Sequence, residues 1–273
     1  MRWMKKMYRA LQMELREHKS SFGVYTTLRI LVIGILFYQI YSRNFESILV
    51  CILTLILLAV PSFLQITLRI ELPIVLEIIL LLFIFAAEIL GEIYEFYIII
   101  PFWDTLLHTL NGFLMAAIGF SLVDLLNRSE KLTFELSPVF LAIVAFCFSM
   151  TIGVMWEIFE FSMDKIFALD MQKDAIIHQI STVTLDPSGG NTPQIIRNIE
   201  NVQVNGTDLG LDGYLDIGLF DTMYDLIVNF IGATVFSVAG YFFAKNKNKK
   251  SLAKRFVPRP KSKEHDFLNQ MKQ

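Results

Sequence analysis

Six long apolar segments constrain the fold of this chain more than any other feature of its sequence. They cover, approximately, residues 23–41, 46–68, 73–93, 102–126, 137–162 and 219–244. A helix needs about 20 predominantly apolar residues to cross the hydrocarbon core of a bilayer, and each segment has about that length. A mean hydropathy of +0.52, with 54% hydrophobic residues, excludes an ordinary soluble domain. The sequence therefore predicts an all-α, polytopic transmembrane helical bundle of six spans.

The distribution of Lys and Arg predicts which side of the membrane each loop faces. Positive residues in short flanking segments are retained in the cytoplasm. Six of the 24 Lys and Arg residues precede the first span, and ten follow the last span. Three more, Arg69, Arg128 and Lys131, fall in the second and fourth loops. We therefore expect both termini in the cytoplasm. Termini on the same side require an even number of spans, which agrees with the count of six.

Two terminal segments flank the membrane domain, for which we expect residues 21–244. Residues 1–20 predict a cytoplasmic amphipathic helix that lies in the membrane interface. Its apolar stripe consists of Met4, Met7, Tyr8, Leu11 and Leu15. Residues 245–273 form a basic cytoplasmic tail, which we expect to be solvated near anionic lipid. No nucleic-acid-binding module accompanies this tail, so we expect no nucleic-acid partner.

One loop, residues 163–218, is much longer than the others and lies on the extracytoplasmic side in this topology. Loops of more than about 15 residues usually carry a function or are disordered. Residues 178–185 and 198–204 are rich in Ile, Val and Thr, and the segment 186–190 favours a turn. We therefore expect a small β element in this loop, between spans five and six.

Ionisable and amide side chains interrupt the apolar segments near one end of the bundle. Asp104, His108 and Asn111 fall on one face of span four by helical spacing. The third, fifth and sixth spans carry Glu88, Glu92, Glu157, Glu160, Asp164, Asp221, Asp225 and Asn229. A charged group at membrane depth costs at least a few kcal/mol, so such groups normally face a protein interior or a wet cavity. The predicted topology gathers these residues near the outer membrane surface.

Two interpretations of this polar cluster stay open. In the structural one, Asp104 and Asp221 cap their helices, Asp164 and Glu92 are solvated, and the buried groups form interhelical hydrogen bonds. In the chemical one, carboxylates and one imidazole on rigid helices bind a divalent metal ion such as Zn, Mn or Mg. The candidate metal ligands are Asp104, His108, Glu157, Glu160, Asp221 and Asp225.

The chemical interpretation predicts a reaction on a lipid or cell-envelope substrate at the outer leaflet. Glu157 or Asp225 would act as the base of a hydrolase or transferase, with His108 as proton shuttle or metal ligand. Intramembrane carboxylates also mark cation paths, so a cation- or proton-coupled transporter is an alternative. A non-catalytic envelope partner or sensor, which would use the long loop as its contact surface, is a third.

Three motifs give the sequence a resemblance to a known family. They are the segments Trp103 to Gly112, Gly153 to Phe161, and Asp221 to Ala233. These motifs resemble the YjdF-like family of bacterial membrane proteins, for which no biochemical activity is established. The same order of motifs is more distantly similar to the VanZ-like envelope proteins. The resemblance implies a multi-pass protein of the bacterial plasma (inner) membrane, in contact with membrane lipid.

Overall fold

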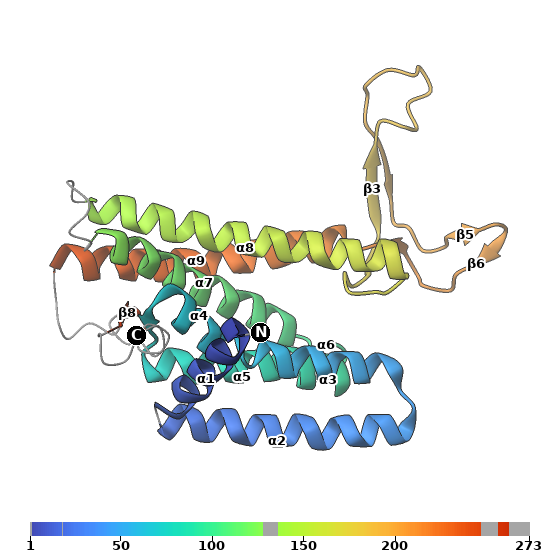
Figure 1. The fold of residues 1–273 in the computed structure, drawn as a ribbon. Coiled ribbons are helices and arrows are strands. Elements are labelled where there is room, and N and C mark those ends of the chain that lie inside the picture. Colours follow the sequence, from blue (N-terminus) through green and yellow to red (C-terminus); the bar gives the residue numbers. More distant parts are fainter. Residues whose placement is uncertain (1, 18, 128–135, 247–255, 262–273) are drawn as a thin grey trace. The chain divides into compact units, whose positions relative to one another are not determined.

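A computed structural model gives the structure of residues 2–17, 19–127, 136–246 and 256–261 (Figure 1). The chain divides into two compact units, Met1–Gly153 with Val228–Gln273, and Val154–Ile227. The divisions fall inside two long helices, α8 (Pro138–Phe167) and α9 (Leu219–Asn246). Each of these helices therefore contributes to both units.

The first unit contains most of the helices. In chain order they are α1 (Arg2–Glu17), α2 (Lys19–Ser42), α3 (Phe45–Leu57), α4 (Val60–Leu68), α5 (Ile74–Phe85), the π-helix η1 (Ala86–Ile93), α6 (Phe96–Ile99) and α7 (Trp103–Asn127). Within the described residues, six helical segments are long and apolar enough to cross a membrane: Ser20–Ser42, Phe45–Thr67, Ile74–Ile93, Trp103–Asp124, Pro138–Phe167 and Leu219–Lys245. The six predicted spans are thereby confirmed, while their orientation stays a prediction.

Two irregularities shape the second and third spans. α3 ends at Leu57 and α4 begins at Val60, with Pro61 in the first turn of α4. Proline is tolerated there because its missing N–H would have no partner inside the helix at that position. α5 passes at Ala86 directly into η1, and π-helical turns are frequent at functional sites. The second span is therefore interrupted between two helices just before Pro61.

Small residues let α7 and α9 approach closely. A β-carbon at Gly232 would lie 2.0 Å from the backbone oxygen of Thr109, a distance that no real β-carbon reaches. One at Gly240 would lie 2.9 Å from the ring of Phe120. The later residue on α9, Gly240, contacts the later residue on α7, Phe120. α7 and α9 therefore run in the same direction, as the fourth and sixth spans must.

The interior of the first unit is apolar and closely packed around aromatic rings. Phe113 and Phe236 lie edge-on with ring centroids 5.1 Å apart, and Phe120 packs beside Phe236. Side chains elsewhere on the fifth and sixth spans, such as Ile143 and Val235, are more than half exposed. An apolar outer surface over an apolar core is what a lipid solvent requires.

The N-terminal helix differs from expectation in the face that it presents to the protein. α1 buries Ala10 and Glu14, whereas Tyr8 of the predicted apolar stripe is 62% exposed. The side chains of the stripe residues Met4, Met7 and Leu15 lie outside the described part of the chain. The helix itself, at Arg2–Glu17, agrees with the prediction for residues 1–20.

Part of the C-terminal tail is folded rather than solvated. Val257 is buried, and β8 (Arg259–Pro260) pairs in antiparallel fashion with β1 (Ile70–Glu71). The Lys261 ammonium donates to the Glu14 carboxylate in an ion pair that is almost fully buried. Long-range pairing with α1 and the α4–α5 connection explains why the expectation of a solvated tail is wrong for residues 256–261. Residues 247–255 and 262–273 lie outside the described residues.

The second unit carries the predicted β element. Its strands are β2 (Ala175–Ile177), β3 (Gln179–Thr182), β4 (Gln194–Arg197), β5 (Gln203–Val204), β6 (Thr207–Asp208) and β7 (Tyr214–Asp216). They form three antiparallel pairs, β2–β7, β3–β4 and β5–β6 (Figure 1). Of the Ile-, Val- and Thr-rich segment 198–204, only β5 is a strand, and Asn198, with a φ of 54°, directly follows β4.

The predicted turn between β3 and β4 is held by one carboxylate. Asp186 accepts hydrogen bonds from the backbone N–H of Ser188 at 3.0 Å and of Thr192 at 2.9 Å. These bonds favour the ionised form, so the Thr192 bond and then the Ser188 bonds lower the pKa of Asp186. The turn expected at residues 186–190 is confirmed.

Candidate functional site

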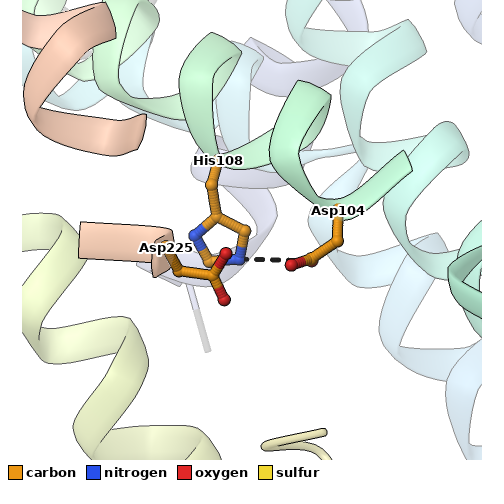
Figure 2. A group of neighbouring side chains, drawn as sticks. All are labelled: Asp104, His108 and Asp225. Carbon is orange, nitrogen blue, oxygen red and sulfur yellow. Dashed lines mark ion pairs between the residues drawn. The ribbon is translucent and has the colours of Figure 1, made fainter. Parts of the chain in front are cut away.

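The first turns of α7 bring together an aspartate and a histidine. Asp104 and His108 lie four residues apart, and the His108 Nε2 atom is 3.5 Å from the Asp104 Oδ1 atom (Figure 2). His108 is buried and Asp104 is half-buried. α7 begins at Trp103, so Asp104 lies inside the first turn rather than at the N-cap. A carboxylate in the first turn complements the helix dipole. The expected N-cap role of Asp104 is therefore wrong, while its role as a metal ligand stays a prediction.

One turn further along the helices, two asparagines join α7 to α9. The Asn111 Nδ2 atom donates to the Asn229 Oδ1 atom at 3.2 Å, and Asn229 is only 1% exposed. A β-carbon at Gly153 would lie 2.6 Å from Asn229 Nδ2, and one at Gly112 would lie 2.1 Å from the Asn229 backbone oxygen. These contacts clamp three spans around one amide. The structural interpretation expects such an interhelical hydrogen bond, and Asn111 and Asn229 form one.

Asp225 lies one turn before Asn229 on the continuous helix α9 and is buried. His108 similarly lies about one turn before Asn111 on α7. Figure 2 shows the Asp225 side chain with those of Asp104 and His108. The ligand atoms of these three residues lie within 4.8 Å of one another, close enough to share a metal ion. This group contains three of the six predicted metal ligands.

Two further predicted ligands, Glu157 and Glu160, are buried on α8. The indole N–H of Trp156 donates to the Glu160 Oε1 atom at 2.8 Å. Glutamates buried within a membrane span must have polar partners or a function. Their burial agrees with the prediction that they face the protein interior.

Asp164 and Asp221 hold the start of the long loop. The two oxygens of Asp164 accept the backbone N–H groups of Met171 at 2.7 Å and Gln172 at 2.9 Å. Asp221 accepts the backbone N–H of Lys173 at 2.8 Å. Asp164 is therefore not the freely solvated charge that was expected, and the amide bound by Asp221 belongs to the loop rather than to its own helix. Sequence spacing could not predict this, because the donors are backbone groups of a distant segment.

The third span holds Glu88 and Glu92 apart from this group. Glu88 is buried in η1, where the π-helical turn carries it inward, whereas Glu92 is exposed. Exposure of Glu92 agrees with the expectation of a solvated charge. Neither residue belongs to the group of Figure 2.

Sequence reasoning missed a buried polar pair at the other end of the third span. Glu77 lies in the first turn of α5 and is 5% exposed. The Gln65 Nε2 atom donates to Glu77 Oε1 at 3.2 Å, and the Gln65 Oε1 atom accepts the backbone N–H of Leu72 at 2.9 Å. The signal available in the sequence was one amide and one carboxylate, both placed in apolar segments.

These features define the class of the protein. It is a polytopic helical membrane protein whose last three spans bury a set of carboxylates, amides and one histidine. The chain belongs to the family described as "Predicted membrane protein (DUF2238)", the YjdF-like family, whose model matches residues 24–246. No curated protein and no solved structure matches the chain, and the VanZ-like resemblance is not shown.

Proposed function

We propose that the chain is a cation-dependent hydrolase or transferase of the bacterial plasma membrane, acting on a lipid or cell-envelope substrate at the outer leaflet. The observation that carries this proposal is the group Asp104, His108 and Asp225. These residues hold one divalent cation. With both termini in the cytoplasm, that cation lies towards the outer membrane surface.

The chemistry of the three ligands supports a catalytic rather than a purely structural cation. One imidazole nitrogen and two carboxylate oxygens suit Zn and Mn. Three protein ligands leave a coordination position for water or substrate, whereas structural zinc sites are closed by four. A bound cation lowers the pKa of its water and polarises an ester or phosphoester oxygen.

Glu157 is the candidate base in this proposal. It is buried on α8, one turn after Gly153, which packs against Asn229. Because Asp225 serves as a cation ligand, the base role falls to Glu157, which removes a proton from the attacking water or hydroxyl group. Asp225 would be the base only if no cation binds.

Comparative mass spectrometry of the envelope tests the reaction. Cells producing the wild-type chain are compared with cells producing Glu157→Gln or Asp225→Asn at equal protein levels. His178→Ala is the matched control, because His178 is exposed in the loop and its ring nitrogen Nδ1 lies 3.1 Å from the Ile199 carbonyl oxygen. The wild type and the control should consume one lipid or envelope component that both carboxylate variants leave unchanged. Four identical profiles would exclude the proposed reaction.

A cation- or proton-coupled transporter is the second candidate, and the Gln65–Glu77 pair favours it. A transporter needs polar groups on both halves of its path. The Gln65–Glu77 pair is a polar group near the start of the third span, which is the cytoplasmic end in the proposed topology. Uptake of a labelled cation by reconstituted protein, lost in Glu77→Gln, would support transport over hydrolysis. Cation uptake no greater than that of vesicles without protein would exclude the transporter.

A further inference from the structure

The second unit contains a cavity at the outer ends of α8 and α9. Its volume is about 480 Å³, and its walls come from the end of α8, the start of α9 and loop residues between them. All of its lining residues fall between Phe161 and Thr222. The proposed cation site has no residue in this lining, so the cavity is distinct from that site.

One part of the lining, the apolar wall, consists of apolar side chains. Phe161, Ile217 and Leu219 line it and are at least half exposed. α8 has 30 residues, which gives it a length of about 45 Å. A hydrocarbon core of about 30 Å cannot cover such a helix fully, so its last turns reach the headgroup region. The apolar wall is therefore accessible to the chains of lipids.

A second part of the lining, the acidic wall, is negatively charged. Asp164, Asp170 and Asp174 line it, against one cation, Lys165. The Lys165 ammonium lies 5.8 Å from the centre of the Phe161 ring, where the ring face partly satisfies its charge. This wall therefore carries an excess of negative charge beside the apolar one.

The electrostatics of Asp174 reflect this excess. Burial raises its pKa, and the nearby carboxylates of Asp170, Asp216 and Asp164 raise it further, against a smaller opposite effect of Lys173. Like charges disfavour ionisation because each carboxylate feels the field of the others. A cation in the cavity would relieve that repulsion.

We propose that this cavity binds an amphiphile that carries one positively charged amine headgroup. The amine lies against Asp170 and Asp174, and the hydrocarbon chain lies against Phe161, Ile217 and Leu219. A bare divalent cation would leave the apolar wall unused, and a neutral lipid would leave the carboxylates repelling one another. The juxtaposition of the two walls at the membrane surface selects a ligand with both parts.

Calorimetric titration of the full chain in nanodiscs of zwitterionic lipid tests this proposal. The probe is dodecylamine, with dodecanol as the uncharged analogue and propylamine as the analogue without a long chain. We expect saturable binding of dodecylamine at one site per chain, at least about tenfold tighter than that of either analogue. Equal affinity for dodecanol would show partitioning into lipid only, and equal affinity for propylamine would show a simple cation site. Either result overturns the proposal.

Variants assign the binding to this cavity. Asp170→Asn with Asp174→Asn should weaken dodecylamine binding at least about tenfold. The matched control is Glu200→Gln with Asp212→Asn, which removes the same charge from exposed positions of the same loop outside the cavity lining. Hydrogen exchange of the loop reports whether each variant stays folded. Unchanged binding in a folded Asp170/Asp174 variant would contradict the assignment.

A variant of the apolar wall and a pH series complete the test. Ile217→Ser, at a side chain that is 70% exposed, should weaken binding without loss of fold. Because the amine needs ionised carboxylates and the pKa of Asp174 is raised, affinity should begin to fall at a pH above the ordinary aspartate value of about 3.9. If neither Ile217→Ser nor a lower pH changes the affinity for dodecylamine, the ligand binds outside this cavity.

Discussion

At single residues, the packing of the bundle depends on glycines, which have no side chain, as much as on larger residues. Gly112 and Gly232 let two backbones meet where any β-carbon would collide with a carbonyl oxygen. The space that Gly153 leaves open is filled by the Asn229 amide. These glycines therefore determine how closely the helices approach one another around Asn229.

Substitution of one glycine tests this dependence. Gly232→Ala should destabilise the protein by about 1–3 kcal/mol, the usual cost of overpacking a core. Gly34→Ala is the matched control, because a β-carbon at Gly34 on α2 meets nothing within 4 Å. It should be neutral or stabilising by about 0.5–1 kcal/mol. Unfolding of purified protein by heat or denaturant measures both, and equal stability of the two variants would refute the close contact.

Several helices and strands are held in place by contacts with segments that are distant in the sequence. β8 pairs with β1, nearly 190 residues before it, and Lys261 pairs with Glu14 of α1. Sequence patterns could predict the helix α1 from its own periodicity. They could not predict that its polar residue Glu14 faces inward, since that depends on the distant Lys261. The same limit applies to Asp164 and Asp221, whose donors lie in the long loop.

Loss of the buried ion pair should release the C-terminal segment. Lys261→Met leaves Glu14 buried without its cation, and breaking a buried pair costs about 3–5 kcal/mol. Segment 256–261 should then open locally and become sensitive to protease in inside-out vesicles. Lys245→Met is the control, because that lysine is exposed over the Tyr241 ring. Adding Glu14→Gln should restore part of the resistance; equal cleavage of all chains would contradict the pairing.

The β3–β4 turn should weaken at low pH. The folded pKa of Asp186 lies below its unfolded value, so its contribution is complete above about pH 3.9 and is lost as pH falls through the folded value. At neutral pH, Asp186→Asn should therefore increase hydrogen exchange at the Thr192 amide, corrected for intrinsic rate. At a pH below the folded pKa, the wild type should match the variant. A constant difference at every pH would exclude the carboxylate as the cause.

For the whole molecule, the sequence predicted the number of spans because membrane crossing depends on the length and hydrophobicity of each segment alone. The approach of His108 and Asp104 was also predictable, since both lie on one helix. Participation of Asp225 could be expected from topology, but its distance to His108 depends on helix packing. The Gln65–Glu77 pair was missed because it joins two spans whose relative rotation the sequence does not specify.

The predicted orientation can be checked with single cysteines. In a chain in which Cys51 and Cys147 are replaced, Ser188→Cys in the long loop should react with a membrane-impermeant maleimide in intact cells. Ser137→Cys, just before α8, should react only after permeabilisation. Both positions are exposed, so accessibility to water does not distinguish them. The reverse pattern would place the termini outside and the polar group near the cytoplasm.

The central claim is that Asp104, His108 and Asp225 bind a divalent cation. Metal analysis of purified wild-type protein, after dialysis against Zn and Mn and removal of free metal, tests it most directly. The account predicts about one ion per chain, with loss of that ion in folded His108→Ala and Asp225→Asn and retention in His178→Ala. Equal metal content in all four proteins, or none in the wild type, would contradict it.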